Sequence, residues 1–368
     1  MGTVQTAKSI DTPLAALHRQ AGAKLGVWFG CVLPDDFGDW QREYWFARKG
    51  LALVDKNYRA YFSLTGPDRV RYLNAILTNN IKDLPAGQGI ISLLLNAQGH
   101  ILAELEVYAL QERLFCVSYA MIRERLGEIL DKYIIMDDVT LTDDTQRYTT
   151  LALEGPRAAS VVSELTGIDL SSLPELGRMD SRVGPIPCSV IRRSPSEFTG
   201  AEFFVERQHV EQLWLVLDEK VRAAGGGAMG YTALSAARLE QGIPWFGYDF
   251  DEKQIPQEAA LENTHLSFTK GCYTGQEIVE RVRSRGQVNR RRVALVFDGD
   301  RVPLAGERLL ATGAEVGNVT RAAFSPSLSR PIGMGYVRKE SNAEGTVLEW
   351  PGGTARISKL PENLRSSV

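Results

Sequence analysis

Two stretches of the chain repeat the same order of apolar and polar positions. Tyr61–Asp68 and Thr150–Arg157 each join a short apolar run, typical of a strand, to a Gly-Pro pair. In both, proline is predicted at the first helical position. Because strand, turn and helix occur twice in this order, the pattern predicts duplicated α+β units whose sheets are covered by helices on one face. The apolar helical positions are Val70, Leu73, Ile76 and Leu77 in one copy and Val161, Val162 and Leu165 in the other.

The residues after each copy continue the predicted sheets. Ile90–Leu95 and Ile101–Tyr108 flank a turn and predict a hairpin. The glycine triplet at residues 225–227 follows a helical segment and has no strand before it, so we interpret it as a helix stop and not as a nucleotide-binding loop. Further predicted elements are strands over Leu114–Ser118 and Phe203–Glu206 and helices over Met121–Ile135 and His209–Arg222.

From Arg291 onward the pattern changes to short β runs separated by glycine and proline, which predicts a small antiparallel barrel. The predicted fold class is α+β, with an α+β region over residues 1–287 and a C-terminal β-barrel over residues 288–368. The two related units of the first region are expected near residues 61–135 and 148–222. The β runs are Val293–Phe297, Glu315–Thr320, Ile332–Val337, Thr346–Glu349 and Thr354–Lys359.

Composition narrows the class of protein but indicates no partner. A chain of 368 residues is long enough for two or three packed units. Its 44% hydrophobic content and net charge of −3 are those of a globular protein and not of a general polyanion binder. The N-terminus lacks a secretion signal and no apolar segment is long enough to span a membrane. Four scattered cysteines without metal-ligand spacing favour a reducing compartment, the cytoplasm, and predict no metal site.

The richest motif is the run Lys270-Gly271-Cys272-Tyr273-Thr274-Gly275-Gln276-Glu277. Thr274 and Glu277 have the spacing of a capping box, which predicts a helix beginning at Thr274 with Ile278, Val279 and Val282 on its apolar side. A helix start beside Lys270 favours negative charge, whether a carboxylate, a phosphate or the thiolate of Cys272. The alternative is that Cys272 is a small buried apolar residue and the glycines are loop punctuation.

Basic residues are concentrated at and after this motif. Such a patch could hold a polyanionic tail, an RNA backbone or an acidic partner surface, or could be a solvated face. The absence of interleaved aromatic residues makes RNA the weakest of these options. The basic residues are Lys270, Arg281, Arg283, Arg285, Arg290, Arg291 and Arg292.

A second cluster runs from Arg238 to Asp249. Here the aromatic residues Trp245, Phe246 and Tyr248 follow a helix that ends at Gly242. A planar heteroaromatic ligand could stack on them beside the Arg238 guanidinium. The alternative is that the aromatic residues seal the core below the loop.

An ordered series of motifs resembles the glycine-cleavage T-protein (aminomethyltransferase) superfamily over nearly the whole chain. Within it, the run from Lys270 to Glu277 resembles the hallmark of the YgfZ branch, while Thr12-Pro13-Leu14 is nearer to the T-protein pattern. The other matching segments are Leu64–Asp68, Leu77–Asn80, Leu95-Asn96 with Gly99, Leu153–Pro156, Arg238–Gly247, Ile255-Pro256 with Glu258, and Ile332-Gly333 with Tyr336-Val337.

This resemblance implies ferredoxin-like units around a central channel that binds tetrahydrofolate, followed by a β-barrel. The implied folate-binding residues are Asn96, Glu202, Arg238, Trp245, Lys270 and Tyr273. The chain departs from the T-protein pattern where that family carries an Asp-Asp pair implicated in catalysis, because Ala103 and Glu104 occupy those positions. Ile91 replaces a tyrosine, and Leu234 and Ser235 replace an Arg-Asp pair.

Two functions of different classes follow from the resemblance. The leading hypothesis is a tetrahydrofolate-binding protein of YgfZ type that supports iron-sulfur cluster assembly or repair, or tRNA modification, through Cys272. Its partners would be iron-sulfur assembly factors or client enzymes. The alternative is a folate-dependent aminomethyltransferase or demethylase that uses Glu104 or Glu202 in place of the missing aspartate. RNA binding through Arg281–Arg292 is a third and weaker hypothesis.

Overall fold

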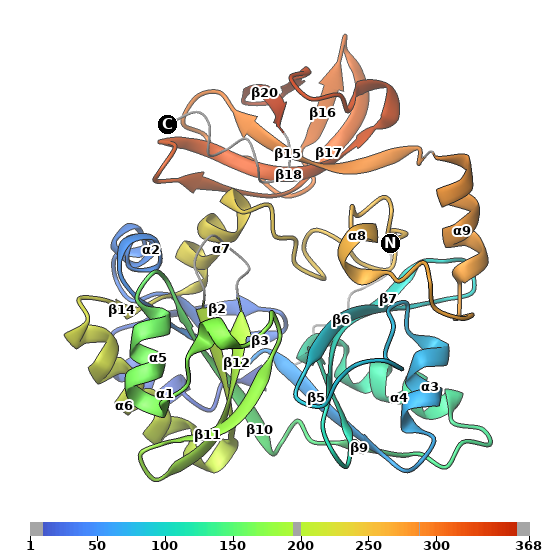
Figure 1. Ribbon diagram of the computed structural model, residues 1–368. Coiled ribbons are helices and arrows are strands. Elements are labelled where there is room, and N and C mark those ends of the chain that lie inside the picture. The colour runs from blue at the N-terminus through green and yellow to red at the C-terminus, as the bar shows by residue number, and fades with distance from the viewer. Residues whose placement is uncertain (1–9, 194–199, 287, 359–368) are drawn as a thin grey trace. The chain divides into compact units, whose positions relative to one another are not determined.

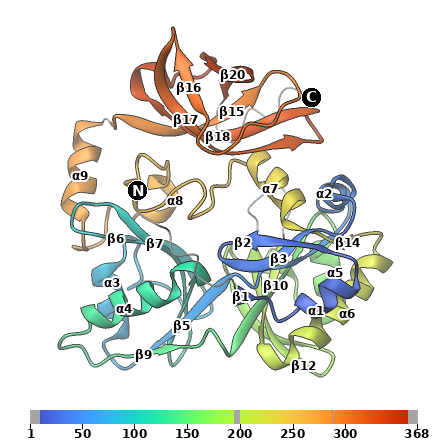
Figure 2. The ribbon, with the colours of Figure 1, turned by 180° about the vertical axis from the view of Figure 1, so that it is seen from behind.

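The computed structural model describes residues 10–193, 200–286 and 288–358 (Figures 1 and 2). The chain forms two compact units whose segments interleave along the sequence. The first unit comprises the residues up to Leu73 together with Ile81–Ile91 and Leu105–Leu234. The second comprises Asn74–Asn80, Ser92–Glu104 and the residues from Ser235 onward.

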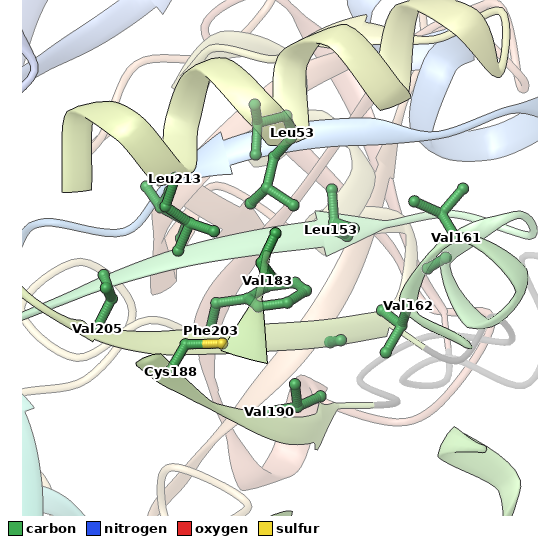
Figure 3. Packing of buried hydrophobic residues seen from close by; sticks show 14 of the residues in the cluster. Leu53, Leu153, Val161, Val162, Val183, Cys188, Val190, Phe203, Val205 and Leu213 are labelled. Atoms are coloured by element: carbon green, nitrogen blue, oxygen red, sulfur yellow. The ribbon is translucent and has the colours of Figure 1, made fainter. Parts of the chain in front are cut away.

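A six-stranded sheet with the order β11-β12-β13-β10-β4-β14 forms much of the first unit. Every second side chain of its strands packs under helices α5 and α6, as Figure 3 shows for Leu153 and Phe203 beneath Leu213 of α6. The opposite face of the sheet carries Arg193 and Glu202. The strands are β4 (Ala52–Asp55), β10 (Tyr148–Glu154), β11 (Arg178–Val183), β12 (Ile186–Arg193), β13 (Gly200–Glu206) and β14 (Gly227–Ala228), and the helices are α5 (Ala158–Thr166) and α6 (Val210–Ala223).

A five-stranded sheet with the order β6-β7-β8-β5-β9 contains the predicted hairpin. Helix α4 begins two residues later than predicted, after a 3-10 turn. Aromatic side chains of this sheet, among them Tyr61 and Phe115, form a buried cluster with Phe204 of the six-stranded sheet, all within the first unit. The elements are β5 (Arg59–Thr65), α3 (Arg69–Ile76), β6 (Gly89–Leu95), β7 (Ile101–Ala109), β8 (Leu114–Tyr119), η1 (Ala120–Ile122), α4 (Arg123–Tyr133) and β9 (Thr140–Asp143).

The predicted strand-turn-helix repeat is present in both sheets. Strand β5 leads through Gly66-Pro67 into α3, and β10 leads through Gly155-Pro156 into α5. The prolines lie in the turns and not at the first helical position, because the helices begin at Arg69 and Ala158. The remaining elements of the first unit are β1 (Ile10–Asp11), α1 (Ala15–Gln20), β2 (Lys24–Trp28), β3 (Cys31–Asp36), α2 (Trp40–Lys49), η2 (Leu170–Ser172) and η3 (Arg207–His209).

The C-terminal part of the second unit is a closed antiparallel barrel with the order β15-β18-β17-β16-β19-β20. Buried apolar side chains such as Leu295, Val319 and Leu348 form its core. The predicted α+β fold with a C-terminal barrel is therefore confirmed, although β16 was not predicted and Lys359 lies outside the described residues. The elements are α7 (Tyr231–Glu240), α8 (Glu262–His265), α9 (Gln276–Arg285), β15 (Arg290–Phe297), β16 (Arg308–Ala311), β17 (Ala314–Ser325), β18 (Arg330–Arg338), η4 (Lys339–Ser341), β19 (Val347–Trp350) and β20 (Gly353–Ser358).

Candidate functional site

The helix after the Lys270–Glu277 run does not begin with a capping box. Helix α9 starts at Gln276 and follows Gly275, whose φ of 81° lies in the left-handed region. This turn separates Thr274 from the helix, so the predicted start at Thr274 is wrong. Two hydrogen bonds close the turn, from the Gln276 amide to the Tyr273 backbone oxygen at 3.2 Å and from the Tyr273 amide to Gln276 Oε1 at 3.3 Å.

The four cysteines differ in exposure. Cys31, Cys116 and Cys188 are buried, whereas Cys272 is exposed in the loop before α9. Burial raises the pKa of Cys31 and of Cys116 to about 12, so these thiols are protonated at neutral pH. The alternative in which Cys272 is a small buried apolar residue is therefore wrong.

Gly275 and Gly271 form a matched pair within the motif. An added Cβ at Gly275 would lie 2.5 Å from the backbone oxygen of Asn96, whereas one at Gly271 would meet nothing within 4 Å. Gly275→Ala is expected to lower the free energy of unfolding by about 2–3 kcal/mol through strain and this clash. Gly271→Ala is expected to change it by less than about 0.5 kcal/mol. Urea unfolding of both variants checks this, and equal effects would contradict it.

Lys270 contacts the last turn of helix α3 and the segment that follows it. Its ammonium donates to the backbone oxygens of Asn74 at 2.5 Å, Leu77 at 2.5 Å and Asn79 at 3.2 Å. Burial lowers the pKa of Lys270 to about 8, so the side chain is still mostly protonated at neutral pH. The Lys270 ammonium also lies over the Tyr273 ring, 5.1 Å from its centroid. Through its three hydrogen bonds, Lys270 holds residues 74–79 in place within the second unit.

Glu104 of strand β7 is hydrogen-bonded to His265 of the short helix α8. Glu104 Oε1 lies 2.9 Å from His265 Nε2, and the two side chains are only 11% and 8% exposed. The other ring nitrogen, His265 Nδ1, lies 2.7 Å from Thr264 Oγ1. The neighbouring Ala103 is buried and carries no acid-base group.

The hydrogen bonds of this pair restrict where its protons lie. An ionised carboxylate only accepts hydrogen bonds, so ionised Glu104 requires a proton on His265 Nε2. Nδ1 then either accepts from the Thr264 hydroxyl as a neutral ring or donates to it as imidazolium. The Glu104–His265 pair therefore places an imidazole oriented by a carboxylate, an arrangement that general acid-base chemistry uses.

Thr78, which like His265 belongs to the second unit, helps to position His265. Its hydroxyl donates to the backbone oxygen of His265 at 2.7 Å and accepts from the Leu93 amide at 2.9 Å. Lys270 holds the adjacent residues, so the Leu77-Thr78-Asn79 segment connects the motif to the Glu104–His265 pair. The sequence prediction included Glu104 and missed His265, because no spacing along the chain relates residues 161 positions apart.

The predicted stacking surface around Trp245 is covered by Arg238 itself. The guanidinium lies over the Trp245 ring at 4.3 Å from its centroid and forms an ion pair with buried Asp249. Asp249 also accepts from the Trp245 amide at 2.9 Å and from the Thr320 hydroxyl at 2.8 Å. These contacts favour the alternative in which the aromatic residues seal the core, and Asp249 is a partner that the sequence prediction missed.

Asn96 closes the hairpin turn. Its Oδ1 accepts from the amides of Gln98 and His100, both at 2.9 Å. This is the local pattern expected of an asparagine that stabilises a turn. Its proposed contact with folate stays a prediction.

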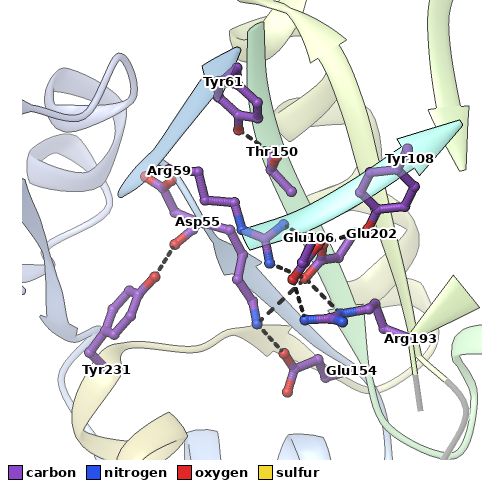
Figure 4. A network of polar contacts seen from close by, with 11 residues as sticks. Asp55, Arg59, Tyr61, Glu106, Tyr108, Thr150, Glu154, Arg193, Glu202 and Tyr231 are labelled. Carbon is purple, nitrogen blue, oxygen red and sulfur yellow. Dashed lines mark hydrogen bonds and ion pairs between the residues drawn. The ribbon is translucent and has the colours of Figure 1, made fainter. Parts of the chain in front are cut away.

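Glu202 lies in a buried ionic network of the first unit (Figure 4). Its Oε1 is 2.8 Å from Arg59 Nη2 and 3.5 Å from Arg193 Nε, while its Oε2 is buried without a hydrogen-bond partner among the described residues. Glu106 completes the network through Arg193 at 2.7 Å and Tyr108 at 2.8 Å. Burial alone would raise the pKa of Glu106, but the two arginines outweigh it and lower this pKa to about 2.

The predicted basic patch is largely paired with carboxylates. Arg292 is buried and donates to the backbone oxygen of Ala259 at 2.8 Å. The side chain of Arg285 lies outside the described residues. The four remaining arginines form the pairs Arg281–Glu277 at 2.7 Å, Arg283–Glu280 at 3.4 Å, Arg290–Glu258 at 3.3 Å and Arg291–Glu262 at 2.6 Å. This pairing reduces the positive field on which RNA binding would depend.

Within the described ranges, no group of three or more His, Cys, Asp or Glu side chains is arranged to hold a metal ion. In the same part of the chain, every helix is too short or too polar to cross a membrane.

Comparison with known proteins gives consistent matches. The GCVT N-terminal domain matches residues 14–266 and the glycine cleavage T-protein C-terminal barrel domain matches residues 290–361. Aminomethyltransferases of Streptomyces avermitilis and Streptomyces coelicolor are 30% and 31% identical to the chain, with 91% of each chain covered in both cases. The crystal structure of the glycine cleavage system aminomethyltransferase T from Bartonella henselae superposes with a TM-score of 0.85 at 25% identity, covering 96% of this chain and 98% of that one. The chain belongs to the glycine cleavage T-protein family.

Proposed function

We propose that this protein is a tetrahydrofolate-dependent transferase that moves an aminomethyl or methyl carbon onto folate. The observation that carries the proposal is the hydrogen bond of 2.9 Å between Glu104 and His265. This pair provides acid-base capacity one position beyond Ala103, which occupies the place of the family's aspartate. The names of the Streptomyces relatives support a transferase better than they support an iron-sulfur role.

The proposed role of the pair follows from the protons that must move. When a folate nitrogen bonds to the incoming carbon it loses a proton, and the departing amine or thiolate gains one. His265, oriented by Glu104 and Thr78, would take up the first proton at Nδ1 and deliver the second. Ionised Glu104 stabilises the imidazolium that forms in between, as a carboxylate beside histidine does in other acid-base sites.

Glu202 supports the choice of folate. Its Oε2 is buried and lacks a hydrogen-bond partner among the described residues, although a buried carboxylate oxygen without a donor is costly. The amino and ring N–H groups of a pterin are donors of the kind that this oxygen lacks. We therefore propose Glu202 as a pterin-binding residue of the first unit.

The proposal is tested by incubating the purified protein with tetrahydrofolate and a series of aminomethyl and methyl donors. Mass spectrometry is expected to detect methylene- or methyl-tetrahydrofolate with at least one donor. Calorimetry on the same preparation measures folate binding separately. Tight folate binding without any one-carbon product across the donor series would contradict transfer.

A YgfZ-type role is a second candidate, because the whole Lys270–Glu277 run matches that branch and Cys272 is exposed. In this role Cys272 would serve iron-sulfur cluster assembly or repair. The test is complementation of a strain that lacks its own YgfZ-type protein. If Cys272→Ala restores iron-sulfur enzyme activity as well as the unchanged chain does, this candidate fails.

A further inference from the structure

The side chain of Lys270 stabilises the end of helix α3 from a distant part of the chain. Its Nζ lies among three backbone oxygens, that of Asn74 in the last turn of α3 and those of Leu77 and Asn79 beyond it. The last carbonyl groups of a helix have no partner within the helix, and a basic side chain suits them. An ammonium has three N–H donors and no acceptor, so three oxygens match it completely.

The residues that Lys270 holds also hold the segment around His265. The Thr78 hydroxyl donates to the backbone oxygen of His265 at 2.7 Å, and the Thr78 backbone oxygen accepts from the Ser267 amide at 3.0 Å. The side-chain amide of Asn79 donates to the backbone oxygen of Thr264 at 3.4 Å. Residues 264–267 and Lys270 are therefore fastened to the same short segment, and the position of the His265 backbone depends on the position of residues 77–79.

This arrangement requires the protonated form of Lys270. A neutral amine has two N–H donors and one lone pair, so one of the three oxygens would face a lone pair instead of a donor. The other two hydrogen bonds would lose the additional strength that a charged donor gives. Loss of the proton is therefore expected to release the end of α3 and to loosen the residues that hold His265.

We propose that protonated Lys270 is a positioning residue for the Glu104–His265 pair, and that loss of its proton switches proton transfer off by displacing His265. The inference rests on the proposed transferase function. Lys270 acts through Thr78 and not on the reacting atoms. A displacement of about 1 Å in a catalytic group can lower a rate by roughly 100-fold, so a loosened His265 is sufficient for a large effect.

The groups around Lys270 determine the pH at which this switch operates. Burial lowers the pKa of Lys270 to about 8, and the end of α3 contributes backbone oxygens to its surroundings. Tyr273 of the same loop lies beneath the ammonium, but burial, with Glu280 of α9 nearby, raises the pKa of Tyr273 to about 12. The other titratable groups, Glu104 of β7 and His265 of α8, are the pair that is positioned. Turnover is therefore expected to fall as pH rises through about 8.

Kinetics of one-carbon transfer over a pH series test the proposal. Lys270→Met is expected to lower turnover by roughly 10- to 100-fold at neutral pH, with a much smaller change in folate affinity. Lys270→Arg keeps a cation that stays protonated, so it is expected to retain turnover and to lose the alkaline fall. The control Lys132→Met removes an exposed lysine from the last turn of α4 and is expected to keep both. An alkaline fall that persists in Lys270→Arg would overturn the proposal.

Histidine NMR separates this proposal from the proposed function, because it requires no substrate. The chain has four histidines, and the spectrum of His265→Asn identifies the ring signals of His265. These signals are expected to shift as pH passes about 8 in the unchanged protein and not in Lys270→Arg. If they do so while no one-carbon product forms, the proposed function fails and the link between Lys270 and His265 stands. If product forms while the signals do not respond near this pH, the positioning role is overturned.

Discussion

Replacing Arg59 by methionine is expected to lower the free energy of unfolding by about 3–5 kcal/mol. Arg59 is 6% exposed and lies between Glu202 at 2.8 Å and Glu106 at 3.4 Å. Methionine preserves much of the side-chain volume but leaves the two buried carboxylates with less positive charge. Chemical denaturation at neutral pH, monitored by circular dichroism, measures the change.

An exposed pair of the same unit provides the control. Arg147 and Glu206 are 2.9 Å apart, and their side chains are 57% and 38% exposed. Arg147→Met is therefore expected to lower the free energy of unfolding by less than about 1 kcal/mol. Equal losses in the two variants would show that the burial of the Arg59 network has no energetic consequence.

Acid unfolding adds a second measurement on the same variant. The folded-state pKa of Glu106 lies below its ordinary value, so its stabilising contribution is present above about pH 4.5 and is lost as pH falls towards about 2. Without Arg59 this pKa moves back towards 4.5, and acid unfolding is expected to begin at a higher pH. An unchanged acid midpoint would contradict the assignment of the shift to Arg59 and Arg193.

Glu104→Gln is expected to reduce the turnover number for one-carbon transfer by roughly 10²- to 10⁴-fold. Glutamine keeps the shape of the side chain but removes the negative charge that stabilises protonated His265. The affinity for tetrahydrofolate is expected to change much less, because the lost charge of Glu104 affects proton transfer and not folate binding. Steady-state kinetics over a pH series and calorimetry on the same protein separate the two quantities.

Glu112→Gln, at an exposed turn position, is the matched control and is expected to leave turnover unchanged. His265→Asn is expected to lower turnover by a similar factor to Glu104→Gln, and the double variant by little more than either single change, because the two side chains act as one unit. Additive effects of the two changes, or a loss confined to folate affinity, would contradict an acid-base role.

The hydrophobic pattern was sufficient to predict most of the fold. The repeated strand-turn-helix and the C-terminal barrel both depend on local periodicity, which the chain displays clearly. Strand β16 (Arg308–Ala311) was missed because its four residues show no clean alternation of apolar and polar side chains. Its pairing with β17 is also irregular, with a shift of register between Leu309 and Leu310. Strand β1 has only two residues and depends on its parallel pairing with Cys31 and Val32 of β3.

The candidate site was less predictable, because the partners of its charged groups come from distant parts of the chain. Glu202 was singled out, yet Arg59, which lies 143 positions away, was not. Likewise, the sequence analysis named Glu104 but not His265, which lies 161 positions away. The capping box failed for a local reason: Gly275 adopts a left-handed turn, so Thr274 and Glu277 have the correct spacing without the correct backbone.

The interleaving of the two units has a consequence for biosynthesis. Residues 74–80 and 92–104 leave the ribosome well before Thr264, His265 and Lys270, with which they form the second unit. These early segments must therefore wait for most of the chain to be translated before their hydrogen bonds can form. A fragment that starts at Ser235 would lack the acceptors of Lys270 and the carboxylate of Glu104, so this C-terminal segment is not a complete folding unit by itself.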